Sequence, residues 1–419
     1  MSSQLFNVSS KKFISVALLG FASAILYALS FKMHYDIAQM LDRASHFLKT
    51  GEIIFHGNQS SADMGKIPGG LLTVMVGFPM KLFNSPLSAL FVLALWHFAA
   101  LLMLMDTLKS HFNSAVLFLF LVLYWLSPWR ASEIYLWNPS YLFLPMAMHL
   151  WSSQKMSVEK SFWPSFFHLL SIGLAFQMHN SSIILAFISA ILFYKGAIRI
   201  HWGGILTSAF VIFASLFPYL LELLHNNQVR PKMEDERYFL FRGLLYVFPM
   251  LKSIWYWIRF SGTIFPRHIL QNIDFQWLGS GATIVGGIWS LVKYGVGIAT
   301  TLLSIYANYR FFKGNKSLFS LTWKGRTLWR QDQWLELYVC IALTSMLIAA
   351  AISPIDFIFW HLEILYPVAL IPLLYFFQTH DWKIKPERLA TGLIFYFSVY
   401  NLICALGSQK FEGALLLFK

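Results

Sequence analysis

Charged side chains are scarce in this sequence. Asp, Glu, Lys and Arg together make up 12% of the 419 residues, whereas hydrophobic residues make up 57% and aromatic residues 18%. A typical soluble domain carries roughly 25% charged residues, because water must solvate its surface. The shortage of charge therefore excludes an ordinary soluble domain and predicts a polytopic integral membrane protein.

Motifs for metals and nucleotides are also missing. The two cysteines, Cys340 and Cys404, both lie in apolar runs and predict neither a disulfide nor a metal site. The histidines and acidic residues lack the spacing of a zinc site. No glycine-rich loop runs into Lys-Ser or Lys-Thr, as binding of nucleotide phosphates would require. We expect no cofactor and no metal site, and the sequence leaves a divalent metal ion open.

Apolar stretches that could form membrane helices occur along the whole chain. About 20 apolar residues suffice to cross a bilayer as a helix. The first stretch follows Lys11 and Lys12 and precedes no small-residue cleavage site, so we interpret it as a retained helix and not as a signal peptide. We predict an all-α bundle, a single membrane domain over 1–419, with about eleven spans near 13–31, 86–106, 112–126, 134–151, 164–178, 181–195, 203–224, 280–309, 334–352, 358–377 and 389–407.

The basic residues predict the orientation of this bundle. The formal net charge is +13, and most basic side chains fall in short loops that would share one side of the membrane. The short loops of the other side carry only Arg130. Because cytoplasmic loops are enriched in Lys and Arg, we place the N-terminus in the cytoplasm. The positive charge is attributed to orientation and contact with membrane lipids, and no nucleic-acid partner is expected.

Two long segments then lie outside, 32–86 and 225–279. In the first, apolar residues such as Ile37, Met40 and Ala44 recur at three- and four-residue spacing, which predicts an amphipathic helix on the membrane surface. A shorter apolar stretch, 71–83, follows in the same segment. The second segment opens with the charged run 230–237 and continues with aromatic residues interrupted by basic ones, so we expect it to lie at the interface.

Asp36 directly follows the first apolar span, where a carboxylate is costly to bury. Asp36 is either a functional residue or a solvated cap on the surface helix. In the second case, the positive N-terminal end of the helix dipole would stabilise its negative charge.

Several short patterns follow Asp36 in the order and topology typical of a known family. The chain resembles the GT-C superfamily of membrane glycosyltransferases, and most closely the bacterial protein mannosyltransferases and lipid A aminoarabinose transferases. A single acid at Asp36 differs from the acidic pair of many relatives, and no large extramembrane C-terminal domain is expected. The patterns that carry the resemblance are Asp36 with its surface helix, Gly65 to Gly70, Trp129 to Glu133, Leu136 to Pro139, Phe176 to Ser181 and His361 to Pro367.

The resemblance implies an enzyme that moves a sugar from a polyprenyl-phosphate donor to a glycan, lipid or protein acceptor. Transfer would take place at the outer, periplasmic face of a bacterial inner membrane. Asp36 would be the general base that deprotonates the acceptor as it attacks the anomeric carbon, which inverts the configuration in one displacement. A monophosphate leaving group and a long lipid tail would need cations and an apolar groove.

Arg130 and Glu133 are the first candidates to bind the substrate. A guanidinium can bind two phosphate oxygens at once. Arg130 could therefore hold the donor phosphate, or it could bind lipid headgroups. Glu133 could orient acceptor hydroxyls or pair with Arg130. His179 and Asn180 occupy a tight turn between two apolar helices, where a histidine either binds substrate or bonds within the protein.

His361, Glu363 and Lys66 complete the predicted site. His361 and Glu363 are two positions apart in the first turn of a span and so do not share a helical face. Lys66, beside a Gly-Pro-Gly-Gly-like turn, is a candidate phosphate contact whose simpler role would be binding to headgroups.

Three other functional classes compete with the transferase: a transporter or flippase, an O-antigen polymerase or ligase, and a structural or lipid-scrambling protein. A transporter or flippase of lipid-linked sugars would place ionisable groups near the middle of the membrane and often shows internal repeats. Here most acidic residues fall at one rim, and no repeat is found. An O-antigen polymerase or ligase shares the many helices, the large outer loop and the polyprenyl donor.

Overall fold

The computed structural model describes residues 9–30, 35–59, 65–226, 247–265, 275–319, 329–353, 357–380 and 384–407. Within these ranges the chain is almost entirely helical. The only sheet among these residues is an antiparallel hairpin of β1 (His56–Gln59) and β2 (Lys66–Pro68). The all-α fold expected from the sequence is confirmed.

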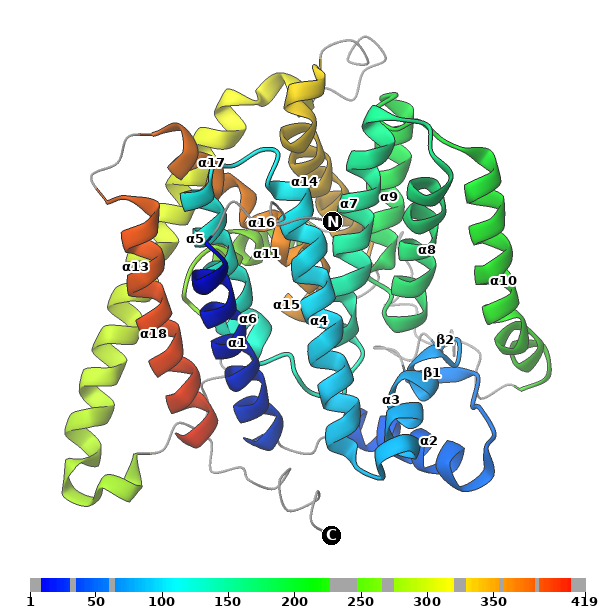
Figure 1. Ribbon diagram of the computed structural model, residues 1–419, viewed down its shortest axis with the longest axis horizontal. Coiled ribbons are helices and arrows are strands. Elements are labelled where there is room, and N and C mark those ends of the chain that lie inside the picture. The colour runs from blue at the N-terminus through cyan, green and yellow to red at the C-terminus, as the bar shows by residue number, and fades with distance from the viewer. Residues whose placement is uncertain are drawn as a thin grey trace.

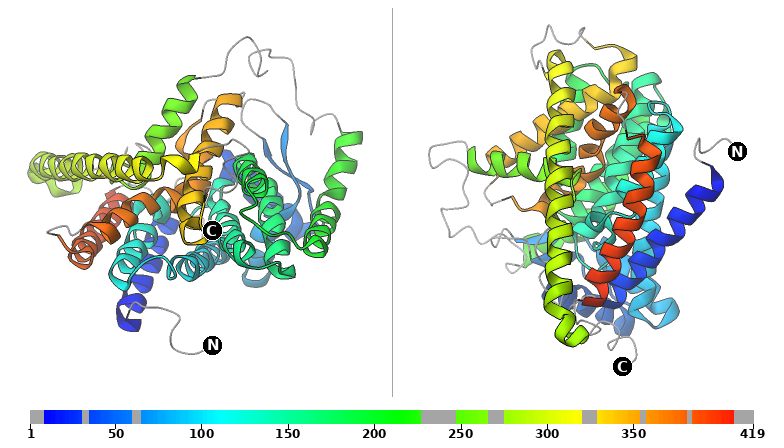
Figure 2. Two further views of the ribbon diagram at one scale, coloured as in Figure 1. Left: turned by 90° about the horizontal axis from the view of Figure 1, so that it is seen from above. Right: turned by 90° about the vertical axis from the view of Figure 1, so that its left-hand side faces the viewer.

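Most helices stand side by side in one bundle (Figure 1, Figure 2). Apolar side chains fill its interior, and the exposed flanks of the outermost helices are also apolar, as for Phe210 in α10 and Leu291 in α13. The helices of the bundle are α1 (Ser10–Ser30), α4 (Pro86–Leu108), α5 (Ser114–Trp125), α7 (Phe143–Val158), α8 (Phe162–Met178), α9 (Ser182–Tyr194), α10 (Trp202–His225), α13 (Ala282–Gly314), α14 (Trp334–Ile352) and α18 (Pro386–Gly407).

Seven helical stretches in the described residues are long and apolar enough to cross a membrane. One of them, Phe359–Thr379, is not a continuous α-helix but the succession α15 (Phe359–Leu362), η8 (Glu363–Leu365), α16 (Tyr366–Ala369) and α17 (Ile371–Thr379). The other six are Ser10–Ser30, Pro86–Leu108, Trp202–His225, Leu278–Gly314, Gln331–Ile352 and Pro386–Ala405.

The remaining predicted spans coincide with the shorter helices α5, α7, α8 and α9. The span expected from residue 134 begins only at Phe143, because residues 134–142 form an irregular segment and the 3₁₀ turn η2 (Pro139–Leu142). Pro139 has no N–H to donate and stands at the first position of η2, where a proline is well tolerated. The total of about eleven spans stays a prediction.

The segment after α1 forms a compact element at one end of the bundle, which we call the Asp36 end. It consists of α2 (Tyr35–Thr50), β1, β2 and α3 (Leu71–Phe83), and Figure 1 shows these elements gathered beside the start of α4. The predicted amphipathic helix is present as α2, and its position on a membrane surface stays a prediction. Its apolar face, with Ile37, Met40 and Ala44 buried, packs largely on α3.

Basic residues concentrate at the opposite end of the bundle. Lys109 and Lys195 cap α4 and α9, Lys155 and Lys313 lie in the last turns of α7 and α13, and Arg330 precedes the 3₁₀ turn η7 (Gln331–Gln333). This distribution agrees with the asymmetry expected from the sequence. Of the second long segment, 227–246 and 266–274 lie outside the described residues, and α11 (Val247–Phe260) packs across α13, α14 and α15.

Gly20 allows α1 to pack closely against α5. The indole N–H of Trp125 donates to the carbonyl of Ala17 (3.1 Å), and a Cβ at position 20 would lie 2.0 Å from the indole nitrogen. The absence of a side chain at Gly20 is therefore required for this contact.

Gly20→Ala should destabilise the protein although alanine is the better helix former. The added methyl must displace Trp125 or the whole of α1, and overpacking of this kind costs about 1–3 kcal/mol. Gly295→Ala is the matched control, since a methyl added at that position of α13 would have nothing within 4 Å of it. Thermal unfolding in detergent measures both, and an unchanged midpoint for Gly20→Ala would contradict this packing.

Candidate functional site

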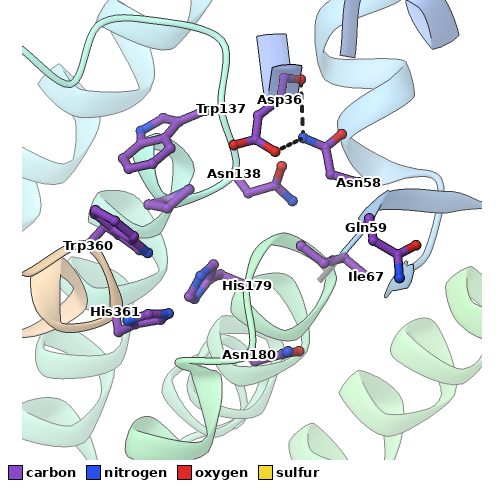
Figure 3. Close-up of a pocket in the computed structure, with 11 residues that line it drawn as sticks. Asp36, Asn58, Gln59, Ile67, Trp137, Asn138, His179, Asn180, Trp360 and His361 are labelled. Atoms are coloured by element: carbon purple, nitrogen blue, oxygen red, sulfur yellow. Dashed lines mark hydrogen bonds between the residues drawn. The ribbon is translucent and has the colours of Figure 1, made fainter. Parts of the chain in front are cut away.

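A cavity opens at the Asp36 end, between the helix bundle and the element of α2, β1 and β2. The empty space in and directly in front of this cavity, which is open to solvent, is about 520 Å³. The side chains around it come from segments far apart in the sequence and converge on one space (Figure 3). Its lining residues are Asp36, Asn58, Gln59, Ile67, Trp137, Asn138, Pro139, His179, Asn180, Trp360 and His361.

Asp36 lies in the first turn of α2 and reaches the cavity from the surface element. The side-chain amide of Asn58 donates to the main-chain carbonyl of Asp36 (3.1 Å) and lies 3.5 Å from Oδ1 of the Asp36 carboxylate. Arg43, buried on the same helix, donates in turn to Oδ1 of Asn58. The proposed base is therefore part of a polar chain that ends in a buried guanidinium.

His179 and His361 face each other across the bundle side of the cavity, with 5.4 Å between ring centroids. The backbone N–H of Ser181 donates to Nδ1 of His179 (3.1 Å), and that of Ile358 donates to Nδ1 of His361 (2.9 Å). A ring nitrogen that accepts a hydrogen bond cannot carry the proton, so these backbone contacts favour the neutral tautomer with its proton on Nε2; Nδ1 of His179 also lies 2.7 Å from Oγ of Ser181. Both rings are thus set as hydrogen-bond donors through Nε2.

Burial, and then the nearby ring of His361, lower the pKa of His179 from its ordinary 6.5 to about 3. At pH values between these two pKa values, His179 binds a proton in the unfolded chain but stays neutral in the folded protein. The free energy of unfolding should therefore decrease as the pH falls from about 6.5 towards 3.

His179→Gln should flatten this pH dependence. Thermal midpoints in detergent at several pH values between 7.5 and 4 test the prediction, with His46→Gln at a half-buried position of α2 as control. Part of the slope should persist in His179→Gln, because burial also lowers the pKa of His56 and of His111. Identical slopes for wild type and His179→Gln would show that His179 does not resist protonation.

Two tryptophans give the cavity its aromatic walls. Trp137 packs edge-on against Trp360, with ring centroids 5.8 Å apart, and its indole N–H donates to Oε2 of Glu133 (2.7 Å). Asn138 beside it donates to the carbonyl of Met178 (2.8 Å), which joins the segment before η2 to the end of α8. The walls are therefore held by hydrogen bonds from behind.

Glu133 and Glu363 were predicted to contact substrate, but the structure places both behind the cavity wall. Each is 1% exposed, and neither lines the cavity. The two carboxyl groups interact electrostatically, and burial raises the pKa of Glu133. Glu133 accepts the hydrogen bond from the indole N–H of Trp137 and so positions this wall of the cavity from behind.

Arg130 was expected at the donor phosphate, and the structure places it elsewhere. Its side chain is fully buried, and the guanidinium stacks 3.9 Å from the ring centroid of Trp125. It donates to the carbonyl of Trp125 and lies 3.5 Å from that of Gly20. The short helix α6 (Pro128–Ala131) turns Arg130 into the core between α1 and α5, away from the cavity.

Lys66 lies on β2 next to the cavity residue Ile67, but it belongs to a polar cluster that faces α10. Its ammonium group is 2.8 Å from Nε2 of His56, and Nδ1 of His56 is 2.8 Å from Glu222 of α10. Partial burial, and then the charge of Arg43, lower the pKa of Lys66. This cluster joins the hairpin to the end of α10.

Of the residues predicted for the site, Asp36, His179, Asn180 and His361 meet in one cavity, whereas Arg130, Glu133, Glu363 and Lys66 do not line it. Sequence reasoning missed Arg43 and Asn58 as partners of Asp36. A basic residue on the apolar face of the predicted surface helix was the available signal for Arg43, because such a charge is buried only with partners. Nothing in the sequence singled out Asn58.

No group of three or more His, Cys, Asp or Glu that could hold a metal ion occurs in the part of the chain that the structure describes. Comparisons with protein-family models, with curated proteins and with solved structures find no match for this chain.

Proposed function

We propose that the protein is a membrane glycosyltransferase of the GT-C type that takes a sugar from a polyprenyl-phosphate donor. The observation that carries the proposal is the position of Asp36 in a cavity with aromatic walls, several amide side chains and two histidine donors. Small-molecule sites combine apolar and aromatic walls with a few placed polar groups in this way. The cavity lies at one end of a helix bundle whose basic residues concentrate at the other.

In this proposal the sugar of the donor lies against the wall formed by Trp137 and Trp360, with its anomeric carbon towards Asp36. The Asp36 carboxylate removes the proton from an acceptor hydroxyl as the hydroxyl oxygen bonds to the anomeric carbon. The bond from this carbon to the phosphate oxygen breaks, and polyprenyl phosphate leaves with the electron pair. The result is one displacement with inversion of configuration, assisted by general-base catalysis.

The leaving phosphate would be met by hydrogen-bond donors and not by a cation in the cavity wall. No Lys or Arg is among the described residues that line the cavity. His179 and His361 carry their protons on Nε2, and donors aimed at developing charge in a site shielded from water are effective stabilisers of a transition state. The exposed apolar flank near Asn180, with Phe176 and Ile183, would accept the start of the lipid tail.

Transfer from polyprenyl-phosphate-linked glucose, mannose and galactose, each radiolabelled in the sugar, tests the proposal. Purified protein is incubated with each donor and with membranes of the producing cells as acceptor. We expect label to move from at least one donor to an acceptor, with release of polyprenyl phosphate. Movement of the intact donor across vesicles without cleavage would instead indicate a flippase, and polymerisation of a lipid-linked oligosaccharide would indicate a polymerase.

A further inference from the structure

We propose that Arg43 and Asn58 act as positioning residues that orient the carboxylate of Asp36. This inference rests on the proposed function, because it assigns a role to groups that act through the proposed base. It concerns neighbours of the base that themselves need not touch the substrate.

The hydrogen bonds determine which way the Asn58 amide points. The guanidinium of Arg43 has only donors, so the atom of Asn58 that it contacts must be the oxygen Oδ1. The amide nitrogen is then turned towards Asp36, where it contacts the main-chain carbonyl and Oδ1 of the carboxylate. The chain of donors therefore runs in one direction, from Arg43 through Asn58 to Asp36.

The burial of Arg43 makes this series of hydrogen bonds rigid. Arg43 is 6% exposed and Asn58 is 2% exposed. The described residues show no salt bridge between Arg43 and a carboxylate, and the acids whose charge it feels are its neighbour Asp42 and Asp36 itself. Burial lowers the pKa of Arg43 to about 10, so it stays charged at neutral pH. Its charge reaches the base through the polarised amide of Asn58.

This arrangement suits a base that must present one oxygen to an acceptor. Binding of Asn58 to both the main chain and Oδ1 of Asp36 restricts rotation of the carboxylate. A catalytic group displaced by about 1 Å can lose roughly 100-fold in rate. The other ionisable groups near Asp36 include Tyr135, which feels its charge, His179 and His361 in the cavity, and Lys66, His56 and Glu222 in the cluster between the hairpin and α10.

Asn58→Asp tests the inference with a nearly isosteric change. The new carboxylate can still accept from Arg43, but it cannot donate to Asp36 and places a like charge beside it. We expect transfer at neutral pH to fall about 10- to 100-fold. We also expect the acidic limb of the pH–rate profile to move up by roughly one unit, because a neighbouring negative charge disfavours ionisation.

Two further variants separate positioning from a structural role. Arg43→Lys keeps a charged donor for Asn58 and should retain the wild-type pH limb, with a smaller loss of rate. Asn113→Asp makes the same amide-to-acid change at the N-cap of α5, which Asp also satisfies, and should leave the profile unchanged. Thermal midpoints are measured for all variants, and Asn58→Ala, which removes the donor without adding charge, is used if Asn58→Asp does not fold.

The outcomes are distinguishable. If Asp36→Asn transfers sugar as well as wild type, the proposed function is wrong and the role of Asn58 falls with it. If Asp36→Asn is inactive while folded Asn58→Asp, or Asn58→Ala in its place, keeps the rate and pH limb of wild type, the positioning inference alone is overturned.

Discussion

Asp36→Asn should lower sugar transfer by about 10²- to 10⁴-fold, the range expected for loss of a general base. The amide has nearly the same shape, so Asn58 keeps a neighbour of similar size, but an uncharged amide cannot remove the acceptor proton. Binding of the donor should change little, since Asp36 takes part in deprotonating the acceptor and not in holding the lipid. The measurement is initial rate against donor concentration, with the rate constant and KM separated.

Asp42→Asn is the matched control for this variant. Asp42 lies on the same surface helix, α2, and is exposed to solvent outside the cavity. Its replacement makes the same chemical change at a distance of six positions and should keep most of the wild-type rate. Equal losses in both variants would point to a general effect of charge on α2 rather than to a base at Asp36.

His179→Phe should have the second largest effect, a loss of about 10²- to 10³-fold in the rate constant, as measured when a donor to developing negative charge is removed. Phe retains the ring and its contacts with the cavity wall but has no N–H. His179→Gln should lose less, because its side-chain amide can donate from a position close to that of Nε2. A graded order, wild type above Gln and Gln above Phe, is the expected result.

His46→Phe is the control for the loss of an imidazole, since His46, at a half-buried position of α2, pairs with Glu52. A similar rate for His179→Phe and wild type would contradict a role of His179 at the leaving phosphate. An effect confined to KM would instead show that His179 binds the ground state of the donor.

The main features of the fold could be predicted from composition and periodicity. Long apolar runs identify membrane helices because an unsatisfied backbone is too costly in lipid. The apolar spacing of Ile37, Met40 and Ala44 similarly identifies α2. The β1–β2 hairpin could not be foreseen, because its strands are only four and three residues long and carry mixed polar residues.

The site could be predicted in part, for a physical reason. Asp36, His179 and His361 stand at or next to helix ends, and helix ends on one side of a bundle lie at the same end of it, where their side chains can meet. Arg130 also stands at such an end, but the turn of α6 directs it into the core against Trp125. Side-chain direction in an irregular segment depends on local backbone geometry, which helix periodicity does not encode. The burial of Glu133 and Glu363 behind the cavity wall could not be predicted for the same reason.

A structure of the protein bound to a non-transferable donor analogue, a polyprenyl phosphonate linked to a hexose, tests the central claim most directly. We predict that the hexose lies in the Asp36 cavity against Trp137 and Trp360, with the phosphonate beside His179 and His361. Density for the hexose at any other place, with the Asp36 cavity empty, would contradict the assignment of this cavity as the site of sugar transfer.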